Sequence, residues 1–186
     1  MKMKKLIFDE QSHIGKKLFK TILSWLDSPK RKQFNNPDNL LKGSGIQCGQ
    51  TVLEIGCGSG FFTVHASIII GNEGKLYSID LHPLSVEETQ KKVNELGLMN
   101  VVVKKEDAMN SSFEDSMFDL VLLYGVVPAP VISTDSISKE IYRLLKPGGI
   151  CAIWTMMPFW SPRVMQKHAS FTKMERVNGV FRLRKI

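Results

Sequence analysis

Three glycines stand close together in the segment VLEIGCGSGFFT, residues 52–63. Gly56, Gly58 and Gly60 lie between a short apolar run and an apolar helical pattern. A glycine-rich turn from a strand into a helix brings the backbone close to a ligand. A dinucleotide site has the spacing G-x-G-x-x-G, whereas this chain has G-x-G-x-G and places Phe61 where the third dinucleotide glycine would stand. The spacing therefore disfavours NAD.

Three carboxylates also indicate which class of ligand the glycine turn binds. Glu54 precedes the glycines, Asp80 ends the next strand pattern, and Asp107 follows the one after it. If these strands are parallel neighbours, the three side chains meet at one edge of the sheet, where ligands of open α/β sheets bind. A pyrophosphate would be repelled there. A ligand with a cationic centre and a ribose fits better, because a carboxylate accepts strong hydrogen bonds from hydroxyl groups.

The elements that position these residues follow from the hydrophobic pattern. Helical spacing predicts helices, and short apolar runs between turn residues predict strands. We expect helices over residues 18–26, 37–42, 60–70, 83–96 and 137–145, and strands over residues 51–55, 75–80, 101–106, 118–125 and 150–155. Ser59 is placed to cap the helix that begins at Gly60.

The order of these elements predicts the fold class. Strands alternate with helices across residues 51–155, and several strands are apolar nearly throughout, as is typical of a parallel sheet covered on both faces. Asn178-Gly179 lies between two further strand patterns and predicts a closing antiparallel hairpin. The expected fold is therefore a single doubly wound, mostly parallel α/β sheet with helices on both faces.

Bulk properties exclude several classes of protein. A chain of 186 residues suits one compact domain. Its three cysteines have no CxxC spacing, which disfavours both a disulfide framework and a metal site. No apolar run is long enough to span a bilayer, and the start lacks the apolar region of a secretory signal. We expect a soluble cytoplasmic protein with no membrane partner.

The net charge of +7 comes from lysines and arginines near both termini and at Lys30-Arg31-Lys32. Such clusters could attract RNA or an acidic substrate. The favoured interpretation is that they form solvated faces, because no aromatic-basic RNA-binding motif accompanies them.

Five motifs together resemble those of a known family. They are Glu54-Ile55-Gly56-Cys57-Gly58-Ser59-Gly60, Asp80, Asp107-Ala108, Phe118-Asp119-Leu120-Val121 and Leu145-Lys146-Pro147-Gly148-Gly149. In this order, and followed by the hairpin, they resemble the class I S-adenosylmethionine-dependent methyltransferases. The resemblance runs from about residue 28 to the end. It implies a Rossmann-like sheet of seven strands in which only the last-numbered strand is antiparallel.

The resemblance also implies a cofactor site for S-adenosylmethionine. The glycines would approach the methionine part of the cofactor, Glu54 its amino end, and Asp80 its ribose hydroxyls. Leu81 would lie against the adenine, Asp107 and Ala108 at the adenine edge, and Tyr124 at the substrate opening. The cofactor-binding positions it implies are Glu54, Gly56, Cys57, Gly58, Gly60, Phe61, Asp80, Leu81, Asp107, Ala108 and Tyr124. Each carboxylate could instead satisfy nearby backbone groups, and Cys57 could simply pack against the sheet.

The methyl acceptor is less well defined by the sequence. Methyl transfer from a sulfonium needs mainly alignment and exclusion of water, so it leaves no catalytic signature. The Asn/Asp-Pro-Pro-Tyr box of amino-directed enzymes is replaced by Leu123-Tyr124-Gly125-Val126-Val127-Pro128. A small-molecule acceptor is favoured, with an RNA methyltransferase and a non-catalytic cofactor-binding module as alternatives. His82 could act as a base or shape the adenine pocket, but a surface role is favoured.

A variable segment precedes the first strand. We interpret residues 1–45 as a helical cap and residues 46–186 as the cofactor-binding core. Trp25 and Phe34 could line the substrate opening, although Trp25 could also be helix core. Phe181 and Leu183 on the hairpin could mediate a dimer, but their alternation is that of a half-buried strand, so monomer and homodimer both stay open.

Overall fold

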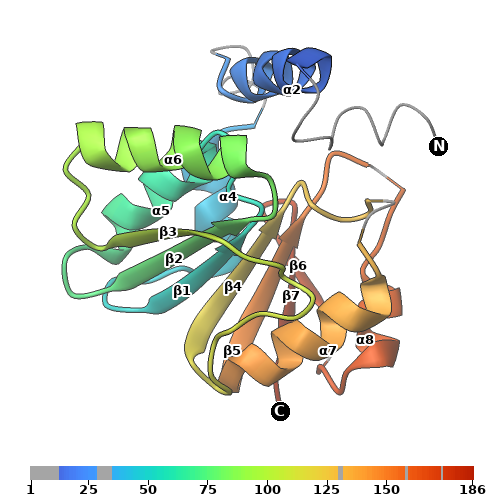
Figure 1. Cartoon of the computed structure of the whole chain (residues 1–186). Helices are drawn as coiled ribbons and strands as arrows, with labels where there is room; N and C mark the ends of the chain where they lie inside the picture. Colours follow the sequence, from blue (N-terminus) through green and yellow to red (C-terminus); the bar gives the residue numbers. More distant parts are fainter. Residues whose placement is uncertain (1–12, 29–34, 130–131, 158, 173) are drawn as a thin grey trace.

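The computed structural model describes residues 13–28, 35–129, 132–157, 159–172 and 174–186. Its centre is a seven-stranded sheet with the order β3-β2-β1-β4-β5-β7-β6 (Figure 1). The strands are β1 (Thr51–Ile55), β2 (Lys75–Asp80), β3 (Val101–Lys105), β4 (Phe118–Tyr124), β5 (Leu145–Trp154), β6 (Glu175–Val177) and β7 (Val180–Arg184). The helices are α2 (His13–Leu26), α4 (Pro37–Ser44), α5 (Phe61–Ile70), α6 (Pro83–Glu95), α7 (Thr134–Leu144) and α8 (Arg163–His168).

The pairing of the strands confirms the predicted doubly wound sheet. β1 to β5 pair in parallel, whereas β7 is antiparallel to both β5 and β6. The hairpin turn lies at Asn178 and Gly179, which both have positive φ angles. This is the backbone geometry that an Asn-Gly hairpin requires. The fold class expected from the sequence is confirmed.

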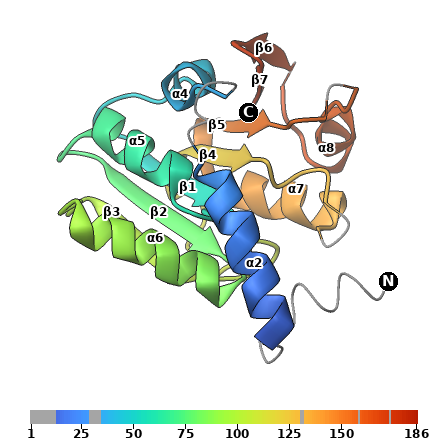
Figure 2. The same ribbon diagram turned by 90° about the horizontal axis from the view of Figure 1, so that it is seen from above.

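Both faces of the sheet are covered, as the apolar strands predicted. Along β4, Val121 and Leu123 contribute to the core beneath α7 and α8, while Leu120 and Leu122 contribute to the core beneath α4 and α5. Figure 2 shows these two groups of helices on opposite sides of the sheet. A strand that is buried on both sides has no polar face, which explains its continuous apolar run.

The structure differs from the sequence-based expectation in several elements, and helix α2 begins five residues earlier than expected, at His13. β5 begins at Leu145, before the expected start at residue 150, because Leu145 pairs with Phe118 across a register shift. The short helix α8 was not expected. Ser59 does not cap α5: the N-cap is Gly60, which has a φ of 75°. This left-handed conformation is open to glycine and carries the chain from the turn into the helix.

Helix α2 lies over the carboxyl edge of the sheet (Figures 1 and 2). The ring of Phe19 stacks on the ring of His82, with centroids 3.6 Å apart and planes inclined by 9°. Asp27 at the end of the helix pairs with Lys92 of α6 at 2.7 Å. His82 is therefore buried rather than at the surface, which corrects the expectation. It also caps α6, because its Nδ1 accepts from the N–H of Leu84.

Two of the open interpretations depend on how the ends of the chain pack. Phe181 and Leu183 are buried, and β7 lies between β5 and β6, so the half-buried-strand interpretation holds for these residues. The division between a cap and a core near residue 45 stays a prediction; α4 packs on the sheet and its Leu41 is fully buried. Among the described helices, none has the length and apolar content that crossing a bilayer requires.

Candidate functional site

A cavity of about 370 Å³ opens at the carboxyl ends of the parallel strands. It lies where the strand order reverses between β1 and β4, the position at which open α/β sheets bind ligands. The turn after β1 forms its floor, β2 and the loop after β3 form one side, and the segment after β4 forms the other. Helix α2 closes it from above through Phe19, Ile22, Leu23 and Leu26.

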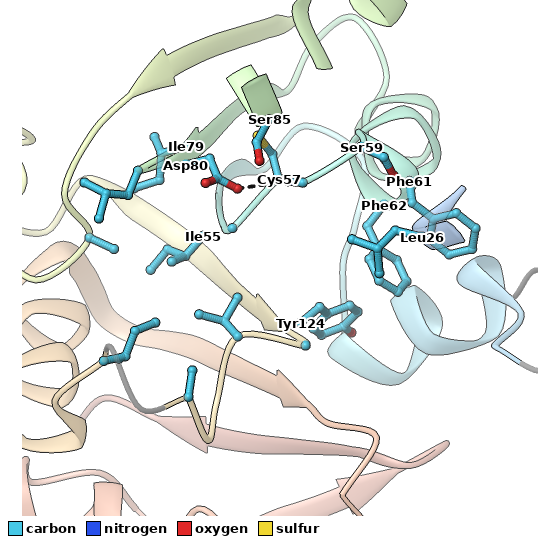
Figure 3. A pocket seen from close by; sticks show the side chains of 18 of the residues that line it. Leu26, Ile55, Cys57, Ser59, Phe61, Phe62, Ile79, Asp80, Ser85 and Tyr124 are labelled. Atoms are coloured by element: carbon cyan, nitrogen blue, oxygen red, sulfur yellow. Dashed lines mark hydrogen bonds between the residues drawn. The ribbon is translucent and has the colours of Figure 1, made fainter. Parts of the chain in front are cut away.

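Most of the site residues expected from the sequence meet in this cavity. Its lining includes Gly56, Cys57, Gly58, Phe61, Asp80, Leu81, Asp107, Ala108 and Tyr124. Figure 3 shows Asp80 and Cys57 on one side of the cavity and Tyr124 on the other. Glu54 and Gly60 are not part of the lining: Glu54 is buried in β1, and Gly60 ends the glycine turn at the start of α5. The geometry therefore brings the predicted positions together, while their contacts with a ligand stay predictions.

The glycine turn is tightly enclosed. Gly56 has a φ of 79°, and a Cβ at this position would lie only 2.5 Å from Cγ2 of Val126. The backbone N–H groups of Gly56 and Cys57 both donate to the carbonyl of Ile79, which ties the turn to β2. A larger residue would have to push the segment after β4 away from the turn. Glycine is thus required here by both conformation and space.

Asp80 connects β2 to the turn. Its Oδ2 accepts from the N–H of Gly58 at 3.1 Å (Figure 3), and its Oδ1 accepts from the N–H of His82 at 2.9 Å. Burial raises the pKa of this carboxyl, and the two backbone donors partly offset that effect. The carboxylate is therefore held rigidly at the cavity wall. A carboxylate oriented in this way can accept further hydrogen bonds from hydroxyl groups of a ligand.

Glu54 is buried beneath the turn rather than exposed to the cavity. Its Oε2 accepts from the hydroxyls of Thr63 on α5 at 2.5 Å and of Ser78 on β2 at 2.7 Å. Burial raises its pKa from 4.5 to about 7, and the two hydroxyl donors only partly counter this. Glu54 thus joins β1, β2 and α5 directly below the site.

The other predicted polar residues are engaged by the protein. Asp107 accepts from the N–H of Met109 at 2.9 Å, a turn contact within its own loop. The hydroxyl of Tyr124 donates to the carbonyl of Leu40 at 2.8 Å, and burial raises its pKa. Burial likewise raises the pKa of the Cys57 thiol. Neither Tyr124 nor Cys57 is therefore a base at neutral pH.

The Ser59 hydroxyl is a polar group of the site that has no hydrogen-bond partner among the described residues. The hydroxyl of Ser59 lines the cavity, is buried, and has no hydrogen bond to any residue that the structure describes. A buried hydroxyl without a partner is costly, so it is a candidate ligand contact. The sequence predicted that Ser59 caps a helix. Its place in the cavity lining follows only from the geometry of the turn.

Sequence reasoning also missed the roof of the cavity and misplaced one residue. Phe19 and Leu23 belong to an apolar stripe that was visible in the sequence, but nothing there showed that it covers the carboxyl edge of the sheet. Trp25 neither lines the cavity nor packs in the core, since its side chain is 56% exposed. Phe34 lies outside the described residues. Among the described residues, no group of histidine, cysteine or acidic side chains could hold a metal ion.

Comparison with known proteins identifies the family. The sequence profile of a family described as a methyltransferase domain matches residues 46–180. A demethylmenaquinone methyltransferase from a Geobacillus species is 31% identical over 120 residues, which cover 64% of this chain and 50% of that protein. The ubiquinone/menaquinone biosynthesis C-methyltransferase UbiE of Haemophilus ducreyi is 30% identical over 141 residues, covering 74% of this chain and 54% of that protein.

A solved structure shares nearly the whole fold. The S-adenosylmethionine-dependent methyltransferase from Aquifex aeolicus has a TM-score of 0.70 and 26% identity, and the match covers 88% of this chain and 96% of that one. The chain spans about half the length of the curated relatives it matches. The family profile, the relatives and the fold agree: this chain belongs to the class I S-adenosylmethionine-dependent methyltransferases.

Proposed function

We propose that this chain transfers a methyl group from S-adenosylmethionine to a small, apolar acceptor. The family's cofactor fits the residues on the β1, β2 and β3 side of the cavity. The free hydroxyl of Ser59 offers a donor to a ligand carboxylate, the Asp80 carboxylate offers acceptors to ribose hydroxyls, and the backbone at Gly58 leaves room for close approach. When bound, the cofactor supplies a methyl group on a sulfonium that a nucleophile can displace in line.

The proposal of an apolar acceptor rests on one observation. The half of the cavity next to β4 and β5, opposite the carboxylates, is lined by apolar side chains. They are Val126, Ala129, Ile132 and Met156, and apolar side chains of α2 close the cavity from above. An anionic or strongly polar acceptor would lose its hydration there without gaining a partner. The relatives named as acting on demethylmenaquinone support this proposal, since that compound is itself largely apolar.

The chain's own residues mainly position the acceptor and exclude water. Helix α2 covers the cavity, which limits competition by water and holds the acceptor against the floor. Among the described residues on the apolar side, the only ionisable one is Tyr124, whose hydroxyl is committed to Leu40. We infer that the acceptor supplies its own nucleophile, such as an easily ionised hydroxyl or the activated carbon beside it.

The test is a turnover assay with labelled S-adenosylmethionine and a panel of acceptors. A reduced demethylated naphthoquinone, an anionic aromatic acid, an isoaspartyl peptide and unmodified transfer RNA would represent the acceptor classes. We expect turnover with the naphthoquinol alone. Methylation of the RNA or the peptide would instead support the alternative enzymes, and S-adenosylhomocysteine binding without any turnover would support the non-catalytic module.

Two variants test the two halves of the cavity separately. Asp80→Asn should weaken S-adenosylhomocysteine binding by about tenfold or more, since a charge-assisted acceptor is lost. Met156→Glu should leave that binding within about threefold of the parent while abolishing turnover, because it places a charge in the half of the cavity beside β5. If Met156→Glu turns over the naphthoquinol normally, the acceptor does not occupy the apolar half.

A further inference from the structure

The large apolar side chains that remain exposed are unevenly distributed over the molecule. Several lie at the carboxyl edge of the sheet, on helix α2 and in the segment that follows β5. We call these residues the edge surface: Ile14, Leu18, Trp25, Met156, Met157 and Phe159. The two parts of the edge surface adjoin the same cavity, because Met156 lines it together with Ile22 and Leu26 of α2. The apolar exposure is therefore concentrated around the mouth of the site.

Part of the apolar surface of helix α2 is not buried against the rest of the protein. Its buried side is formed by Gly15, Phe19 and Leu23. Ile14, Leu18 and Trp25 are spaced by four and seven residues, so they form a second stripe along the neighbouring side. Ile14 is 67% exposed and Trp25 is 56% exposed, which means that this second stripe faces away from the protein.

The remaining side of α2 is basic. Lys16, Lys17 and Lys20 are all exposed and belong to the same helical turns as the apolar stripe. A helix with a solvent-facing apolar stripe that includes a tryptophan, and with exposed lysines on its other free side, has the composition of an interfacial helix. Such a helix lies in the plane of a membrane surface, with its lysines directed to anionic headgroups and its tryptophan at the boundary.

We propose that the edge surface docks on an anionic lipid bilayer, with α2 lying in the headgroup region. The lysine row and the net charge of +7 complement an anionic surface. The expectation of no membrane partner rested on the lack of a spanning segment, whereas docking of this kind needs none. The proposal does not depend on the identity of the methyl acceptor.

Two other occupants explain less of the edge surface. A second copy of the chain on a two-fold axis would bring the lysine rows of both copies close together, and like charges would oppose that contact. RNA would pair with the lysines, but Ile14 and Leu18 offer neither a stacking face nor a hydrogen bond to a base. A bilayer accommodates both the lysines and the aliphatic side chains.

The experiment is co-sedimentation of the whole protein with two kinds of vesicle. One kind is phosphatidylcholine alone, and the other is a mixture of phosphatidylcholine and phosphatidylglycerol. The wild-type protein should bind the mixed vesicles, and the Ile14→Ser, Leu18→Ser, Trp25→Ser triple variant should bind them at least about tenfold more weakly. The Lys16→Gln, Lys17→Gln, Lys20→Gln triple variant should lose the preference for anionic lipid.

A matched control uses exposed apolar residues elsewhere. Ile68 and Met99 are 67% and 87% exposed, so the Ile68→Ser, Met99→Ser double variant removes comparable surface and should sediment like the wild type. The edge variants should keep their S-adenosylhomocysteine affinity, because none of the changed side chains lines the cavity. That readout separates a failure of docking from a failure of the proposed function.

Three outcomes would overturn the proposal. They are equal vesicle binding by the wild type and the Ile14, Leu18, Trp25 variant, no binding of the wild type to either kind of vesicle, and a wild-type dimer that the same variant converts to a monomer. Salt-sensitive binding to transfer RNA that requires Lys16, Lys17 and Lys20, without vesicle binding, would assign the edge surface to RNA instead.

Discussion

At the residue scale, the most unusual group is the carboxyl of Glu54. Its folded pKa of about 7 means that the folded protein keeps a proton that the unfolded chain loses near its ordinary pKa of 4.5. The contribution of this group to stability is therefore fully present below about pH 4.5 and is lost as the pH rises through about 7. The free energy of unfolding therefore falls as the pH rises through this range.

Glu54→Gln should remove that pH dependence, because glutamine keeps a polar side chain of similar size but does not titrate. Urea unfolding of the wild type from about pH 5 to about pH 8 should show stability falling by up to about 3 kcal/mol from this group. The same series for Glu54→Gln should be flatter by that amount. The exposed Glu87 supplies a control, and Glu87→Gln should reproduce the wild-type slope. An unchanged slope in Glu54→Gln would contradict the assignment.

Gly56 is the residue of the glycine turn that should tolerate substitution least. Gly56→Ala combines a positive φ with a Cβ 2.5 Å from Val126, so it should destabilise the protein by about 3 kcal/mol. Gly97 also has a positive φ, but a Cβ there would meet open space, and Gly97→Ala should cost only about 1 kcal/mol. Denaturant unfolding measures both values.

A second substitution tests the steric part of this argument. Val126→Ala removes the methyl group that the new Cβ would strike, so adding it to Gly56→Ala should recover about 1 kcal/mol beyond the sum of the single effects. If the two changes are simply additive, the cost of Gly56→Ala comes from the backbone alone.

At the scale of elements, the site depends on how helix α2 is attached to the edge of the sheet. Phe19 is the largest buried side chain of α2, and it stacks on His82, which itself begins α6. The Asp27–Lys92 pair is partly exposed and should add less than about 1 kcal/mol. The stacking of Phe19 on His82 therefore couples the position of the roof to the start of α6.

Phe19→Ala should release α2 from the sheet edge without unfolding the core. Hydrogen exchange of the α2 amides should become much faster, while the exchange of β1 and β4 amides should change little. S-adenosylhomocysteine should bind about tenfold more weakly, since Phe19 lines the cavity. Asp27→Ala and Thr21→Ala should show neither effect. Equal protection of α2 in Phe19→Ala and the wild type would mean that other contacts hold the helix.

The elements also show what the sequence could and could not predict. The strands, the glycine turn and the Asn178-Gly179 hairpin were predictable because their signals are local. The stacking of Phe19 on His82, the burial of Glu54 beneath the turn and the free hydroxyl of Ser59 were not. Each of these depends on segments that are distant in the chain, and a residue pattern carries no information about their relative placement.

At the scale of the whole molecule, the sheet separates two kinds of chemistry along its carboxyl edge. The carboxylates of Asp80, at the end of β2, and of Asp107, after β3, line one half of the cavity, while apolar side chains after β4 and β5 line the other. We propose that the acidic half binds the cofactor and the apolar half the acceptor, and helix α2 covers both. Because a dinucleotide brings two phosphates, the acidic half should reject NAD while it accepts the cationic donor.

Ligand binding should therefore be visible in the thermal stability of the entire chain. A ligand that binds only the folded state at 100 times its Kd adds about 2.7 kcal/mol, which for a domain of this size raises Tm by about 8 °C. We expect S-adenosylhomocysteine to produce such a shift and NAD at the same concentration to produce none. The shift should shrink in Asp80→Asn, which loses an acceptor, and in Phe19→Ala, which loses the roof. A shift with NAD that equals the one with S-adenosylhomocysteine would show that the acidic half does not select the ligand.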